Sequence, residues 1–200
     1  MAAGVHVGFV GAQIMGGQFF DADSIAEMAL RLHSEPSTTE TLDRVLDYAL
    51  KAVDCDYAGV IFLHKRSRIE TVAATDPLIE KVDRIQLDIS QGPDIDTLES
   101  RLSVIVDDTR TETRWPDWAA LVAGTGIRSM LGVRLYTSDE LLGTLNLYSR
   151  QPQKFDIDDQ AVAHVIARHA AVAIAAWRQS TTLTIVVGMA ALWLAQYALR

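Results

Sequence analysis

Apolar residues recur at helical spacing near the start of the chain, and this pattern predicts two consecutive helices. The first covers residues 24–35 and ends before Pro36, because the residue preceding a proline avoids the α region. The second covers residues 37–54. Each opens on a capping box, formed by Ser24 with Glu27 and by Ser37 with Glu40. The buried face of the second helix is predicted to carry Leu42, Val45, Leu46, Ala49 and Val53.

Two hairpins are predicted further along, where β-branched and apolar residues fill runs of about eight residues between short polar turns. The first joins residues 57–64 to 68–75, and the second joins 129–136 to 141–148. Side chains alternate between the two faces of a strand. In the last strand we therefore expect one face to carry Leu142, Thr144, Asn146 and Tyr148, and the other Leu141, Gly143, Leu145 and Leu147.

Shorter elements are predicted between the hairpins, and an alanine-rich helix follows them. We expect helices over 78–85, 94–98 and 115–123, a buried strand over 104–106, and a final helix capped by Asp156 that runs from 161 to 177. Hairpins imply antiparallel pairing. The predicted fold class is therefore α+β, with an antiparallel twisted sheet, helices on both of its faces, and an apolar helix at the C-terminal end.

Composition and charge narrow the functional classes. The formal charge is −8 and the pI about 5.0, which argues against a nucleic-acid-binding surface built from clustered Lys and Arg. The single cysteine, Cys55, allows no intrachain disulfide, so we expect a cytoplasmic protein. Because carboxylates flank Cys55, we also expect an inert thiol.

The two ends of the chain differ from the middle. Residues 1–23 are glycine-rich, and we expect a mobile arm, because Gln13 stands where a dinucleotide-binding turn needs its middle glycine. Residues 24–179 are predicted to form the domain. Residues 181–199 carry no charge and are long enough to cross about 30 Å of hydrocarbon. Residues 180–200 are therefore interpreted as a membrane anchor, as a dimerisation helix with Val186, Met189, Ala190 and Trp193 on one side, or as a remnant without a role.

Candidate ligand-binding residues lie in the later part of the predicted domain. Trp115 and Trp118 are three apart on a short helix, so both can face inward, either as aromatic walls of a pocket or as core. Arg128, Arg134, Asn146 and Tyr148 lie on or near the central strands. They either point into a pocket and fix the polar atoms of a ligand, or lie on a solvated face. Asparagine is disfavoured within a strand, so Asn146 is the one that most needs an explanation.

Short motifs spread over residues 24–179 resemble those of GAF domains, in particular the GAF domains of actinobacterial regulators that also carry an ANTAR RNA-binding domain. These motifs are residues 32–36, 56–60, 71–75, Gln91-Gly92-Pro93, 113–116, 127–131, 142–148 and 170–175. The resemblance implies an antiparallel sheet with helices on both faces, a pocket under the short middle elements, frequent dimerisation and, in most members, no catalysis.

The sequence also departs from the patterns of related domains. The signature of cyclic-nucleotide-binding members is half altered at Ser149-Arg150, Phe155 and Asp159-Gln160, and Cys55 is not followed by the histidine of bilin-binding members. Asp94 stands where close relatives usually have cysteine. The charged linker and three helices of an ANTAR domain are missing or degenerate, so we expect no direct binding of nucleic acid.

These observations predict a non-enzymatic sensor that binds an unknown small ligand, dimerises with a second copy of itself, and acts in signal transduction or transcription antitermination. The alternative is a dimerisation scaffold without ligand, with membrane tethering through residues 181–199 open in either case. An enzyme such as a sulfoxide reductase needs several pocket cysteines, and the chain has one. We expect no cofactor. We also expect no metal site, because His164 and His169 are five apart and face different sides of a helix.

Overall fold

The structure, a computed structural model, describes residues 22–35, 37–64, 68–99 and 102–198. The expected N-terminal arm lies outside these residues except for Ala22 and Asp23, which already belong to the first helix. The elements in chain order are α1 (Ala22–Ser34), α2 (Thr38–Val53), β1 (Tyr57–His64), β2 (Arg68–Ala74), α3 (Pro77–Ile89), α4 (Pro93–Glu99), β3 (Ser103–Val106), α5 (Pro116–Ala123), β4 (Ser129–Tyr136), β5 (Leu141–Ser149) and α6 (Ile157–Ala198).

The strands form one antiparallel sheet in the order β2-β1-β5-β4-β3. Both predicted hairpins are present, and β5 lies at the centre, paired with β1 on one side and with β4 on the other. The predicted α+β class with an antiparallel sheet is confirmed. The central position of β5 gives its side chains two paired neighbours each, so the most enclosed sites of the molecule lie along this strand.

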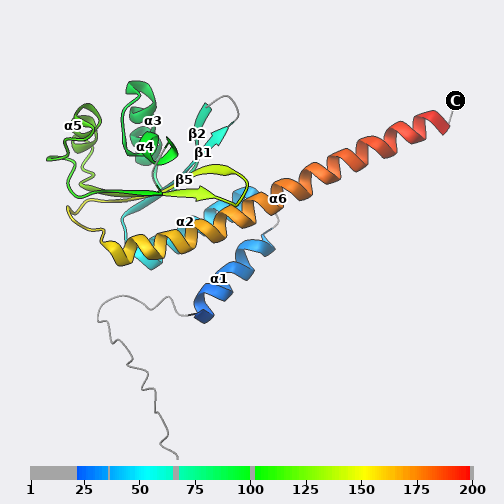
Figure 1. Ribbon diagram of the computed structural model, residues 1–200, viewed down its shortest axis with the longest axis horizontal. Coiled ribbons are helices and arrows are strands. Elements are labelled where there is room, and N and C mark those ends of the chain that lie inside the picture. The colour runs from blue at the N-terminus through cyan, green and yellow to red at the C-terminus, as the bar shows by residue number, and fades with distance from the viewer. Residues whose placement is uncertain (1–21, 36, 65–67, 100–101, 199–200) are drawn as a thin grey trace, which may run out of the picture.

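Helices cover both faces of the sheet (Figure 1). Helices α2 and α6 pack on one face, and α1 packs against both of them. Helices α3, α4 and α5 lie over the other face, with α3 against β1 and β2 and α4 against β4 and β5. The fold is therefore three layers, with a separate core on each side of the sheet.

The helix boundaries follow from local chemistry. Ser37 is the N-cap of α2, as predicted: its Oγ accepts a hydrogen bond from the Glu40 amide and donates one to the Glu40 carboxylate. The cap predicted at Ser24 is wrong, because α1 already includes Ala22 and Asp23. Helix α3 extends four residues beyond the predicted end, to Ile89, and the C-cap Ser90 follows in the left-handed conformation.

The face covered by α2 and α6 buries an apolar core. All five α2 residues predicted to face inward are buried. On α6 the buried positions include several alanines, which let the helix approach the sheet closely: Ala163, Ala167, Ala170 and Ala171.

One strand residue faces the side opposite to that predicted. Leu142 belongs to the core under α2 and α6, not to the face of Thr144, Asn146 and Tyr148. The reason is a β-bulge: Tyr136 pairs with Leu141 and Leu135 pairs with Gly143, which leaves Leu142 as an extra residue. Gly143 stands beside the bulge, where an added Cβ would lie 1.8 Å from the carbonyl oxygen of Ile61. No other residue type fits that position.

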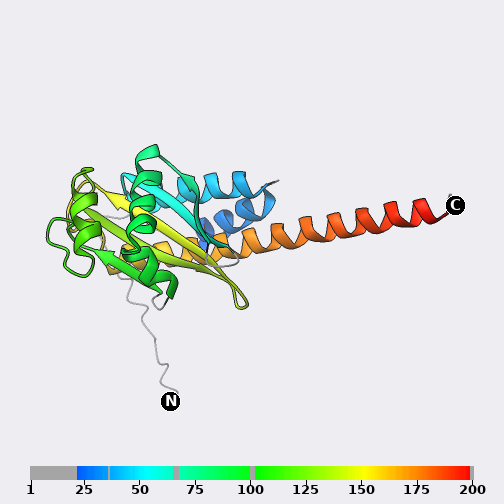
Figure 2. The same ribbon diagram turned by 90° about the horizontal axis from the view of Figure 1, so that it is seen from above.

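Helix α6 continues without a break from the domain through residue 198 (Figures 1 and 2). Its last part, which covers most of the expected C-terminal segment 180–200, projects away from the sheet and the other helices (Figure 2). None of the helices that the structure describes could span a membrane, so the anchor interpretation of residues 181–199 has no support.

Candidate functional site

The sheet face beneath α3, α4 and α5 carries a row of polar side chains on its central strand. Thr144, Asn146 and Tyr148 of β5 all point to this face and all are fully buried. Asn146 pairs with Gly59 of β1 on one side and with Gly132 of β4 on the other, so no neighbouring side chain covers it from within the sheet. The row is the floor of the candidate site.

A buried carboxylate reaches this floor from α3. Asp83 is fully buried, and its two oxygens accept hydrogen bonds from the Tyr148 hydroxyl at 2.7 Å and the Thr71 hydroxyl at 2.9 Å. Burial and the nearby carboxylates raise the pKa of Tyr148 well above its usual 10, so the phenol stays protonated and its hydroxyl donates a hydrogen bond to Asp83. No basic side chain of the described residues forms an ion pair with Asp83.

A second buried carboxylate, Asp94, comes from α4. It accepts hydrogen bonds from the side-chain amide of Gln86 and, at 3.3 Å, from the hydroxyl of Thr144. The amide of Asp94 in turn donates to Gln86 Oε1 at 2.9 Å. Gln86 fits here because the adjacent turn has glycine: a Cβ on Gly92 would lie 2.3 Å from Gln86 Oε1.

The Asp83 and Asp94 carboxyls lie close enough to oppose each other's ionisation. Burial, together with the neighbouring Asp94 carboxylate, raises the pKa of Asp83 to about 8. Burial raises the pKa of Asp94 to about 6, against the lowering effect of the Gln86 hydrogen bond. Two close carboxyls in a dry site titrate as a pair, so burial and mutual repulsion both favour a protonated carboxyl over two charged ones.

Two buried polar groups beside this pair make no hydrogen bond of proper geometry. They are the side-chain amide of Asn146 and the indole Nε1 of Trp118, and both residues are completely buried. The Asn146 amide nevertheless lies close enough to Asp94 and Tyr148 to lower the pKa of both groups. A buried polar group without a partner costs about 1–3 kcal/mol. Asn146 Oδ1 and Asp94 Oδ1 lie near the same point, 3.3 and 3.7 Å from where a Cβ on Gly132 would be. The site thus combines two buried carboxyl groups with an amide and an indole that make no well-aligned hydrogen bond within the described chain.

The two tryptophans lie together on this side of the sheet. Trp115 and Trp118 are both buried, with their rings edge to face and 6.2 Å between centroids. The side chain of Gln91 fixes their helix, since its Oε1 accepts hydrogen bonds from the amides of Asp117 and Trp118 at the start of α5. Trp115, Trp118, Asn146 and Tyr148 are therefore brought to one face.

The two candidate arginines bind the ends of helices instead. Arg134 donates to the carbonyl oxygens of Thr97 and Leu98 at the end of α4, at 2.7–3.0 Å. Arg128 donates to the carbonyls of Ala123 and Ile127 at 2.8 and 3.0 Å, at the end of α5. Both are only partly buried. They hold the cover of the site in place and do not meet Asn146 at its centre.

The buried acids Asp83 and Asp94 are not among the sequence-derived candidates, although a signal for the first was present. Asp83 and Gln86 lie in the apolar stripe of α3, following the buried Ile79 and Val82 at helical spacing. A charged residue within such a stripe is rarely buried unless something pairs with it. Asp94 is one residue further along the turn that Gln91, Gly92 and Pro93 begin.

Two open hollows border the site on the side of β2. One, of about 280 Å³, lies between β2 and α3 and is lined partly by Thr71, Glu80 and Arg84. The other, of about 510 Å³, is lined by Ile69, Leu87, Ser90, Ile95 and Glu99. Thr71 lines the first hollow and donates its hydroxyl to Asp83, so a single side chain separates this hollow from the buried carboxylate.

The described part of this site holds neither a cysteine nor a group of metal ligands. Cys55 packs against the core under α2 and α6, on the opposite side of the sheet, and burial raises its pKa to about 12. Such a thiol stays protonated and is a poor nucleophile. Among the residues that the structure describes, no three His, Cys, Asp or Glu side chains are grouped as metal ligands would be.

Comparison with known proteins places this arrangement in a family. No curated protein matches the chain. Among solved structures, the chain is similar to the GAF domain of a phosphoenolpyruvate-protein phosphotransferase from Acinetobacter (16% identity, TM-score 0.61, 78% of this chain and 93% of that one). It is also similar to the phycocyanobilin-bound GAF domain of a cyanobacterial phytochrome (14%, 0.62, 82% and 98%). A third similar structure is free methionine-R-sulfoxide reductase from Neisseria meningitidis (17%, 0.63, 84% and 99%). These identities establish a shared fold alone. The family model for the GAF domain matches residues 35–175, most of the chain and both layers around the sheet, and the protein therefore belongs to the GAF domain family.

Proposed function

We propose that this chain is a non-catalytic sensory GAF module that binds a small ligand beneath α3, α4 and α5 and passes the signal on through α6. GAF domains are generally sensory, ligand-binding modules of signalling proteins, phytochromes among them. The observation that carries the proposal is Asn146, whose two amide atoms lie fully buried at the centre of the sheet and make no hydrogen bond of proper geometry. A ligand with well-placed hydrogen bonds to this amide would recover the free energy that its burial costs.

The lining favours a ligand that donates hydrogen bonds. Asp83 and Asp94 offer carboxylate oxygens, and Asn146 offers one donor group and one acceptor. Burial and mutual repulsion already oppose negative charge on this pair of acids, so the site favours a neutral or positively charged molecule over an anion. Trp115 and Trp118 add aromatic surface, against which a flat ring can pack.

The hollow between β2 and α3 is the proposed route to this lining. It has a volume of about 280 Å³ and is lined in part by Thr71, whose hydroxyl donates a hydrogen bond to Asp83. The floor is closely packed in the absence of ligand, since a Cβ on Gly59 would lie 2.8 Å from Ile79 of α3. Binding therefore requires α3 to move outward, and this movement is the conformational change that a sensor needs.

Helix α6 is the proposed output. It packs on β4 and continues beyond the domain, so a shift of the sheet reaches its projecting part. The sequence from Thr181 to Leu199 carries no charge, and an uncharged helix that leaves its domain needs an apolar partner. We propose a second copy of the chain as that partner, with the two α6 helices side by side. The dimer would act in signal transduction or, as the resemblance to ANTAR-linked relatives suggests, in the control of transcription.

The second candidate function is a dimerisation scaffold whose buried site beneath α3, α4 and α5 (the chamber) stays closed. The packing over Gly59 favours it, because a Cβ at this position would already lie 2.8 Å from Ile79 of α3. An enzymatic role like that of the similar reductase is less well supported. Reduction of a sulfoxide uses thiols, and the single cysteine lies on the opposite side of the sheet.

Native mass spectrometry of the full chain, purified gently from cells, tests the sensor against the scaffold. The sensor predicts a dimer that carries additional non-protein mass, and loss of that mass in Asn146→Leu with the dimer retained. Leu30→Ala is the control, because Leu30 is exposed on α1 and remote from the chamber. A dimer without added mass after incubation with cell extract would favour the scaffold.

A further inference from the structure

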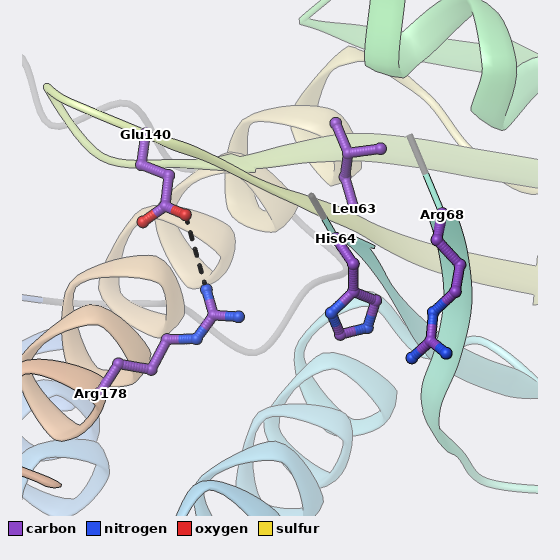
Figure 3. Close-up of a pocket in the computed structure, with 5 residues that line it drawn as sticks. All are labelled: Leu63, His64, Arg68, Glu140 and Arg178. Atoms are coloured by element: carbon purple, nitrogen blue, oxygen red, sulfur yellow. Dashed lines mark ion pairs between the residues drawn. The ribbon is translucent and has the colours of Figure 1, made fainter. Parts of the chain in front are cut away.

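A groove lies at the other end of the strands, where both hairpins meet α6. It has a volume of about 550 Å³ and is lined by Leu63 and His64 of β1, Arg68 of β2, Glu140 before β5, and Arg178 of α6 (Figure 3). None of its lining residues comes from α3, α4 or α5. The groove is therefore separate from the buried chamber, and one of its walls is the helix proposed as the output.

Three side chains that carry or can carry positive charge surround this groove, each from a different element. Figure 3 shows Arg178 reaching from α6 toward Glu140, with the His64 imidazole and the Arg68 guanidinium across from it. The nearest oxygen of Glu140 is 3.7 Å from Arg178 Nη1, a long contact for an ion pair. Both side chains are substantially exposed, so the pair contributes little. An incoming anion can therefore displace Glu140.

The other two side chains, Arg68 and His64, share a single acidic partner among the described residues. Glu70 lies 2.6 Å from Arg68 Nη2 and 3.2 Å from His64 Nε2, so one carboxylate is shared between two nitrogen groups. The His64 Nε2 atom is buried and makes no hydrogen bond of proper geometry. A guanidinium offers five N–H donors in a planar fork, more than one shared carboxylate can use.

We propose that this groove binds the phosphate group of a small organic phosphate. Guanidinium groups match the geometry of phosphate oxygens with paired N–H donors. Arg178 and Arg68 would hold the phosphate from opposite sides, and His64 would add a third donor. The volume of about 550 Å³ is larger than a phosphate ion needs, and Leu63 supplies an apolar wall for the organic part.

The ligand would add a second link between α6 and the β1–β2 hairpin, beside the stacking of the Arg178 guanidinium over the Phe62 ring of β1. Arg178 lies on α6 where the helix leaves the domain, whereas His64 and Arg68 lie on the β1–β2 hairpin at the edge of the sheet. A phosphate bound to both would fix the exit of α6 relative to the sheet. The groove would thus be a second input to α6, independent of the buried chamber.

The test is a titration of the full chain with inorganic phosphate and with ribose 5-phosphate at constant ionic strength, followed by calorimetry and by NMR of the arginine side chains. We expect saturable binding. Arg178→Gln and Arg68→Gln should each weaken it on the order of fivefold, because each variant loses one exposed charge pair with the phosphate. Arg110→Gln is the matched control, because Arg110 is an exposed arginine paired to Asp108 elsewhere on the molecule. The affinity of this variant for phosphate should equal that of the parent.

Glu140→Gln gives the sharpest result. Removing the carboxylate that competes for Arg178 should strengthen phosphate binding about two- to threefold, whereas general unfolding of the groove would weaken it. Vesicles containing phosphatidic acid distinguish the source of the phosphate. Binding to these vesicles that depends on Arg178 and Arg68, with none to free phosphates, would assign the site to a lipid headgroup. The proposal is overturned if no probe binds saturably, or if Arg110→Gln weakens binding as much as Arg178→Gln does.

Discussion

The two faces of the sheet are built from the same strands but differ in what they bury. The face under α2 and α6 holds a continuous apolar core, with no buried charge among its members. The face under α3, α4 and α5 has a smaller apolar cluster, centred on Trp118 and Tyr148, and beside it two carboxylates and an unpartnered amide. Strand β5 shows the contrast within three residues, since Leu145 and Leu147 face one side and Asn146 faces the other.

This difference fits the proposal that one face provides stability and the other recognition. Apolar burial stabilises the fold at about 25 cal/mol per Å², and nothing in the core under α2 and α6 opposes it. Buried carboxyls and an unpaired amide lower stability, so their presence on the other face needs a compensating role. We infer that the first face holds the domain together and that the second face reads the ligand.

The largest expected effect comes from breaking the apolar face. Leu131→Ala removes a fully buried side chain of β4 from the core under α6 and leaves a cavity. We expect the free energy of unfolding to fall by about 3 kcal/mol, measured by urea denaturation. Leu30→Ala on α1, where the side chain is 73% exposed, should change it by less than about 0.5 kcal/mol. A similar loss in both variants would contradict the assignment of this core.

The second prediction tests the contrast between the two faces through the pH dependence of stability. The folded pKa of Asp83 is raised, so the folded state holds this proton more tightly than the unfolded chain. Its contribution is fully present below the ordinary pKa of an aspartate and is lost as the pH rises from about 4 to about 8. Asp83→Asn removes this titration. We expect the variant to be more stable than the parent on the order of 2 kcal/mol at pH 8.5, with the gap closing toward pH 4.

Asp108 supplies the control of opposite sign. The hydrogen bonds from Arg110 lower the pKa of Asp108 to about 2, so its contribution is present above pH 4 and is lost as the pH falls toward 2. Asp108→Asn should therefore show no gain at alkaline pH. Equal pH profiles for the two variants would refute the assignment of a buried, protonated Asp83.

The apolar face is the part that the sequence predicts best. The alternation of β4 and β5 and the helical spacing of α2 place nearly all of its residues correctly, because both periods depend on local geometry alone. Leu142 is the exception. A single extra residue at the bulge reverses its side, and no property of the residue itself signals this.

The polar face is predicted less completely. Asn146 and the two tryptophans stand out in the sequence because a mid-strand amide and a paired indole are unusual. Arg128 and Arg134 lie near this face as well, but they end on helix carbonyls, and which backbone groups lie within their reach depends on tertiary packing. The pairing of Asp83 with Tyr148 joins residues 65 positions apart, which no local pattern encodes.

A smaller effect, opposite in sign, tests the role of the unpartnered amide. Asn146→Leu replaces a buried polar group with an apolar one of similar size, so the free energy of unfolding should rise by about 1 kcal/mol. The same variant should lose any ligand mass seen by native mass spectrometry. A variant less stable than the parent would show that the amide is satisfied in the folded protein, and the case for an open recognition group would fail.

The smallest effect concerns how the polar face is covered. Arg134→Gln removes the hydrogen bonds to the carbonyls of Thr97 and Leu98 at the end of α4, and we expect a loss of about 1 kcal/mol or less because the side chain is partly exposed. Hydrogen exchange should become faster in α4 and remain unchanged in β5. Arg128→Gln is the matched variant, and it should loosen the end of α5 instead.

Because α4 carries Asp94, loosening its end also bears on recognition. If Arg134 serves only to hold α4, Arg134→Gln should speed the opening of the chamber and leave the hydrogen exchange of the core under α2 and α6 as it was. Faster exchange in both layers would mean that the two faces unfold as one unit. The two faces would then differ in the chemistry of the residues that they bury, but not in how readily they open.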